Sequence, residues 1–96
     1  MTDHLPTLER EIKTLLEPSG LAPARDVVEH TLTTGYAHAL RLDAERLRVE
    51  SRLRLLLRSG SAGQPELADA TGELGRVESE LARLRALLAT LRAQAL

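Results

Sequence analysis

The sequence lacks cysteine, phenylalanine and tryptophan, and it contains a single tyrosine. A disulfide framework, a thiolate metal site and a cysteine nucleophile are therefore excluded. Strands favour β-branched and aromatic side chains, so this scarcity also argues against a sheet. No apolar run approaches the roughly 20 residues needed to cross a bilayer, and no secretion signal opens the chain. We therefore expect a cytoplasmic protein without membrane contact.

An excess of charge of one sign is also missing, since 13 basic and 14 acidic residues balance within the 96. Such a chain has no overall field that attracts nucleic acid or a membrane surface. Leucine (21) and alanine (13) dominate the composition, and both are strong helix formers. The length suits one small domain. These features together predict an all-α fold.

Two segments rich in proline and glycine interrupt the helical pattern. They are residues 17–23 and residues 59–65, and the second has the composition of a tight turn between helices. Helices are therefore predicted at residues 5–16, 24–58 and 65–95.

The two long helices carry apolar stripes at alternating steps of three and four residues, the spacing of a coiled coil. The stripes consist of Val28, Leu32, Gly35, Ala39, Leu42, Arg46, Val49, Leu53 and Leu56, and of Leu67, Ala70, Leu74, Val77, Leu81, Leu84, Leu88, Leu91 and Ala95. Because the connecting turn is short, we expect an antiparallel helical hairpin over residues 23–96 with its turn at 59–65. A short N-terminal helix and a Pro/Gly linker, residues 1–22, precede it.

The hairpin is aligned by placing Leu56 opposite Leu67, which sets apolar residues opposite one another along both stripes. This alignment brings together two attractive charge pairs, Arg52 with Glu73 and Glu29 with Arg92, and two repulsive pairs, Asp43 with Glu78 and Glu45 with Glu80. Arg46 is the charged residue within the stripes. We expect it to reach Glu78 or Glu80 on the other helix and so to set the register of the hairpin.

Further apolar side chains lie off the two stripes and require a second interface. They are Tyr36, Leu40, Leu47, Leu55 and Leu57 in the middle helix, and Ala82, Ala86, Leu87, Ala89 and Ala93 in the last helix. One candidate to cover them is the N-terminal helix, which has its own stripe of Leu5, Leu8, Ile12 and Leu15. The other is a second copy of the chain, and we expect a homodimer that forms a four-helix bundle.

Residues 35–60 contain six arginines against three acids. Arg41, Arg48 and Arg52 form one rough row that suits contact with phosphates. No aromatic residue interleaves with them for base stacking. A regulator that binds a nucleotide or nucleic acid through these arginines is one alternative function. A ligand-sensing helical bundle with a pocket at Tyr36 and His38 is a second alternative.

Groups suited to catalysis or metal binding do not converge in this sequence. Asp26 and His30 share a helix face, but a metal site needs at least a third ligand. We therefore predict no enzymatic activity and no cofactor. The sequence favours a non-catalytic protein–protein interaction module, a structural or regulatory adaptor that acts as a homo-oligomer. Its N-terminal helix is expected to dock on the hairpin or on a partner protein of unknown identity.

Overall fold

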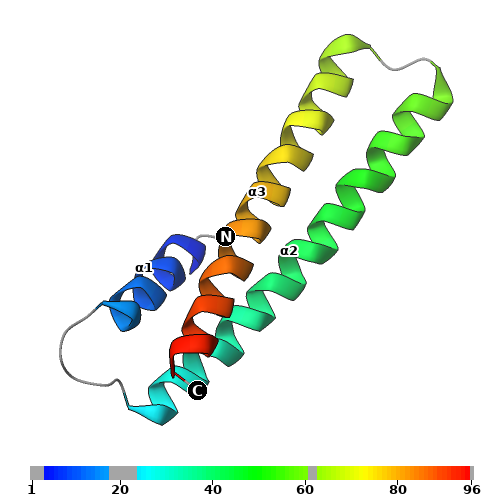
Figure 1. The fold of residues 1–96 in the computed structure, drawn as a ribbon. Coiled ribbons are helices and arrows are strands. Elements are labelled where there is room, and N and C mark those ends of the chain that lie inside the picture. Colours follow the sequence, from blue (N-terminus) through cyan, green and yellow to red (C-terminus); the bar gives the residue numbers. More distant parts are fainter. Residues whose placement is uncertain (1–3, 18–23, 61–62, 96) are drawn as a thin grey trace. The chain divides into compact units, whose positions relative to one another are not determined.

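A computed structural model of the chain describes residues 4–17, 24–60 and 63–95. Within these residues the protein is all-helical, with helices α1 (His4–Leu16), α2 (Arg25–Ser59) and α3 (Gln64–Ala95) and no strand (Figure 1). The three predicted helices are confirmed, and their ends lie within one residue of the predicted ends. The residues of the predicted linker, 18–23, lie outside the described residues, so the division of the chain at residue 22 remains a prediction.

Local chemistry explains where α2 ends and α3 begins. Gly60 follows the last residue of α2 with φ +68°, a left-handed conformation that glycine adopts without strain and that commonly ends helices. Pro65 lies in the first turn of α3, where its missing N–H costs no hydrogen bond. Glu66 also lies in this turn, where its negative charge interacts favourably with the helix dipole.

The chain divides into two compact units, unit 1 (Met1–Ala39 and Arg83–Leu96) and unit 2 (Leu40–Ala82). Both α2 and α3 contribute a segment to each unit, and the two segments within a unit run in opposite directions (Figure 1). Unit 1 also contains α1. A third helix is thus available to cover the paired segments in unit 1, whereas unit 2 has only two.

Helix α1 packs into unit 1 through one apolar face. Ile12 has no exposed surface, and Leu8 and Leu5 are only 3% and 8% exposed. At the edge of this contact, Arg83 of α3 donates a hydrogen bond to Glu9 of α1, with Nε and Oε2 2.8 Å apart. The N-terminal helix therefore folds back within unit 1, as one of the two possibilities left open by the sequence.

The predicted apolar stripes are the buried faces of α2 and α3. In unit 1 every described member is buried, and in unit 2 the buried members are Leu42, Val49, Ala70, Val77 and Leu81. The remaining members in unit 2 are half-buried: Arg46, Leu53, Leu56, Leu67 and Leu74. The side chain of Ala95 lies outside the described residues. The stripes are thus more completely covered in unit 1, the unit that contains α1.

Gly35 fits against Leu88 inside unit 1. A Cβ atom at Gly35 would overlap Leu88 Cδ2 and lie 3.2 Å from its Cγ. Leu88 has no exposed surface, so its side chain has little room to retreat. This contact agrees with the predicted alignment, because Leu56 opposite Leu67 also sets Gly35 opposite Leu88. Glycine at this position of the stripe therefore serves close packing.

Alanine substitutions at two glycines are expected to change stability in opposite directions. Gly35→Ala gains about 1 kcal/mol of helix propensity but overpacks the core at a cost of about 1–3 kcal/mol, so we expect a net loss. Gly75→Ala is the matched control, because nothing lies within 4 Å of its added Cβ, and we expect a gain of about 1 kcal/mol. Urea unfolding of the two variants measures both changes. Equal gains from both substitutions would contradict the tight contact with Leu88.

Candidate functional site

Helix α2 exposes a row of leucines within unit 2. Leu40, Leu47 and Leu55 are 72%, 49% and 61% exposed. The row lies opposite the buried face, since Leu40 precedes the buried Leu42 by two positions, a rotation of about 200° around the helix. We call this row, together with the small exposed residues between the leucines, the outer stripe: Leu40, Ala44, Leu47, Ser51 and Leu55.

The outer stripe forms one continuous face because its members follow one another at steps of three or four residues. Ala44 and Ser51 are short, so they allow the backbone of a second helix to approach between the leucines. Contiguous exposed apolar surface of this kind is typical of an interaction site.

Opposite charges border the outer stripe on its two sides. Arg41 and Arg48 are exposed, and each follows a leucine of the stripe by one residue. Asp43 and Glu50 are half-buried, and each precedes one of its two small residues. One residue forward and one residue back turn in opposite senses around a helix. The stripe therefore has a basic border (Arg41 and Arg48) and an acidic border (Asp43 and Glu50).

Arg46 holds the acidic border in place. Its Nη2 lies 2.8 Å from Asp43 Oδ1, and its Nη1 lies 3.1 Å from Glu50 Oε2. The three side chains are each about one-third exposed or less, at 27%, 31% and 27% for Arg46, Asp43 and Glu50. The hydrogen bond to Asp43, with the negative charges of both carboxylates, raises the pKa of the Arg46 guanidinium above its ordinary value. Because arginine is protonated in proteins in any case, the shift reflects how closely the two carboxylates pair with Arg46.

The predicted partners of Arg46 were wrong. Its ion pairs are with residues three back and four forward on its own helix, and not with Glu78 or Glu80. Glu80 instead pairs with Arg76 of α3, with Glu80 Oε1 3.4 Å from Arg76 Nη1. Partners at such spacing on one helix already lie close to the guanidinium, whereas a partner on α3 requires an extended side chain. Local pairing therefore takes precedence, and Arg46 does not link the helices through these acids.

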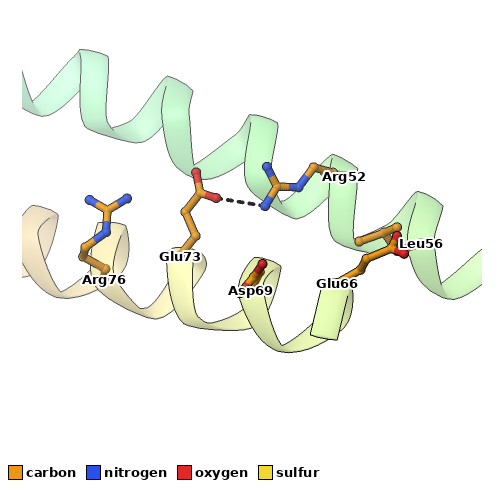
Figure 2. A pocket seen from close by; sticks show the side chains of 6 residues that line it. All are labelled: Arg52, Leu56, Glu66, Asp69, Glu73 and Arg76. Carbon is orange, nitrogen blue, oxygen red and sulfur yellow. Dashed lines mark hydrogen bonds and ion pairs between the residues drawn. The ribbon is translucent and has the colours of Figure 1, made fainter. Parts of the chain in front are cut away.

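A surface hollow of about 560 Å³ lies in unit 2 between α2 and α3. Its lining consists of Arg52, Leu56, Glu66, Asp69, Glu73 and Arg76 (Figure 2). Arg52 Nη2 lies 2.8 Å from Glu73 Oε1, which confirms the charge pair predicted from the alignment. The other predicted pair differs, since Glu29 pairs at 2.8 Å with Arg25 of its own helix. The lining of the hollow contains three carboxylates and two guanidinium groups, and no histidine, serine or cysteine.

The three arginines considered for phosphate binding have different surroundings. Arg52 is half-exposed, and its guanidinium is already engaged by Glu73. Arg41 and Arg48 are exposed on the basic border of the outer stripe. The three arginines are thus not equivalent as phosphate ligands, because a phosphate must compete with the Glu73 carboxylate at Arg52.

A second hollow, of about 370 Å³, lies in unit 1 between α1 and α2. It is lined by Thr7, Arg10, Glu11, Thr14, Leu15, Val27 and Thr31. Neither hollow includes Tyr36 or His38, the residues considered for a ligand pocket. The space beside the neighbouring Gly35 is occupied by the side chain of Leu88.

Among the described residues, no group of three or more histidine, cysteine, aspartate or glutamate side chains is placed to hold a metal ion. In the same residues, no helix combines the length and the apolar character required to traverse a bilayer.

The other residues predicted at a second interface are mostly exposed. Tyr36 is 42% exposed and Leu57 62% exposed. On α3, Ala82, Ala86, Ala89 and Ala93 are exposed and Leu87 is half-buried. Sequence reasoning missed Ala44 and Ser51 as members of the outer stripe, because neither is a large apolar residue. Their spacing from the leucines was the available signal.

Comparison with known proteins gives no relative. No protein-family model, no curated protein and no solved structure matches the chain.

Proposed function

We propose that the protein is a non-catalytic helical interaction module that works as a homodimer, as a structural or regulatory adaptor. The outer stripe carries this proposal, because it places three exposed leucines on one face of α2. Association that removes such surface from water is favourable by about 25 cal/mol per Å² of apolar area. Pairing of the α2 and α3 stripes as a coiled coil belongs to the same proposal.

A regulator that binds a nucleotide or nucleic acid has weaker support. The exposed arginines of the basic border favour it, but the carboxylates of Asp43 and Glu50 lie on the same helix and oppose an approaching phosphate. Binding that falls steeply with salt and is lost in Arg41→Ala/Arg48→Ala would support this alternative.

Replacing two leucines of the outer stripe with serine is expected to convert a dimer into a folded monomer. Leu40→Ser/Leu47→Ser removes apolar surface from both copies, and four lost leucines cost at least about 3 kcal/mol, or about 100-fold in the dimer dissociation constant. The monomer fold should be retained because both side chains are exposed. Light scattering measures the mass, and circular dichroism measures the helix content.

Val27→Ser serves as the matched control, because Val27 is a comparably exposed apolar residue of α2 outside the outer stripe, at 47%. It should leave the dimer intact. A wild-type chain that stays monomeric at high micromolar concentration would overturn the proposed homodimer. Dissociation by Val27→Ser alone would place the interface elsewhere.

A further inference from the structure

We infer that two copies of the chain pair α2 against α2, side by side and in the same direction, through the outer stripe. This inference rests on the proposed homodimer and specifies its contact surface and orientation. All the residues involved belong to unit 2.

The apolar layer of the outer stripe suits a parallel pair. In parallel coiled coils each core residue meets the same residue of the other helix. Leu40 and Leu47 then form two leucine layers, with a layer of the small residue Ala44 between them and a layer of Ser51 after Leu47. The short side chains of Ala44 and Ser51 allow the two helix backbones to approach closely, and the leucine side chains fill the remaining space.

The two borders favour the same orientation. In a parallel pair the residues that flank one side of a stripe lie against those that flank the opposite side of the other stripe. The basic border of each copy therefore meets the acidic border of the other, with Arg48 close to Asp43. Asp43 also binds Arg46, but a carboxylate accepts several hydrogen bonds and can serve two guanidinium groups. One surface thus supplies both signs of charge, which is the condition for self-association.

The antiparallel pair places like charges together. Reversing one helix brings each border against its own counterpart, so that Arg41 meets Arg48 and Asp43 meets Glu50. Like charges directly opposed are unfavourable and select against a partner orientation. The borders therefore discriminate between the two directions even though the leucines fit either.

The close contact between the two α2 helices ends after Ser51. The positions that continue the alternating spacing of three and four residues are Arg54 and Arg58, both exposed, and in a parallel pair each lies opposite its own copy. Their long side chains turn outward to keep the guanidinium groups in water. The closest contact is accordingly confined to the part of the outer stripe from Leu40 to Ser51, and Leu55 lies at its edge.

Single-cysteine variants test the orientation directly, because the chain contains no cysteine of its own. Ala44→Cys and Ser51→Cys place thiols one heptad apart in the outer stripe. A disulfide forms only between Cα atoms about 4.4–6.8 Å apart. Under mild oxidation we expect each variant separately to form a covalent dimer on a non-reducing gel. Ser79→Cys is the control at an exposed position of α3, and we expect it to remain uncross-linked.

The outcomes separate this inference from the proposed function. Cross-linking at only one of the two α2 positions indicates an antiparallel pair, because the axis of such a pair brings only one level of a helix against itself. Cross-linking through Ser79→Cys without the α2 positions indicates pairing through α3. Either result overturns the parallel pairing while the dimer stands. A monomeric mass for the wild-type chain overturns both the parallel pairing and the proposed homodimer.

Discussion

Replacing Ile12 with aspartate is expected to release α1 from unit 1. Ile12 has no exposed surface, so an aspartate there loses the water around its carboxylate, which costs several kcal/mol. The helix has 13 residues, and isolated helices shorter than about 12–15 residues are marginal in water. Once detached, α1 should therefore unfold.

Hydrogen exchange resolved along the chain provides the measurement. In Ile12→Asp the amides of α1 should exchange freely while those of α2 and α3 in unit 2 keep their protection. Thr7→Asp is the control, since it adds the same charge at an exposed position of the same helix. Retained protection of α1 in Ile12→Asp would contradict its docking through this face.

Truncating Leu88 to alanine is expected to produce the largest loss of global stability. A fully buried leucine replaced by alanine typically costs about 2–5 kcal/mol, and Leu88 has no exposed surface. For a chain of this length each 1 kcal/mol lowers Tm by about 4–8 °C, so we expect a decrease of roughly 8–40 °C. Leu74→Ala is the control on the same helix, and it should cost less because Leu74 is half-buried.

The double variant Gly35→Ala/Leu88→Ala tests the same contact from both sides. A methyl group at residue 35 overpacks the wild-type core but partly fills the space that Leu88→Ala leaves. The loss of stability in the double variant should therefore be smaller than the sum of the two single losses. Strict additivity in urea unfolding would argue against direct packing of the two residues.

The sequence was sufficient for the helices and their buried faces. Proline and glycine mark the ends of the helices, and a leucine repeat fixes which side of a helix is apolar. The same repeat fixed the alignment of α2 and α3, as the contacts of Arg52 with Glu73 and of Gly35 with Leu88 show. These features depend on spacing along the chain, which a sequence displays completely.

Other features depend on competition between partners, which spacing alone does not rank. The stripe of α1 shows that this helix needs a partner but does not identify the surface it covers. Arg46 had acids available on both helices, and the nearer ones on α2 took precedence. The leucines of the outer stripe were predicted from the sequence, whereas its basic and acidic borders were not.

The close contact between Gly35 and Leu88 favours one alignment of α2 and α3 during folding. A regular leucine repeat tolerates slippage of one helix past another by a whole heptad, because every leucine then meets a different leucine. Slippage of this kind would set Leu88 opposite Val28 or Leu42, the residues one heptad before and after Gly35, and both leave less room for its side chain than glycine does. The missing side chain thus penalises misaligned pairings and gives a repetitive sequence one preferred alignment.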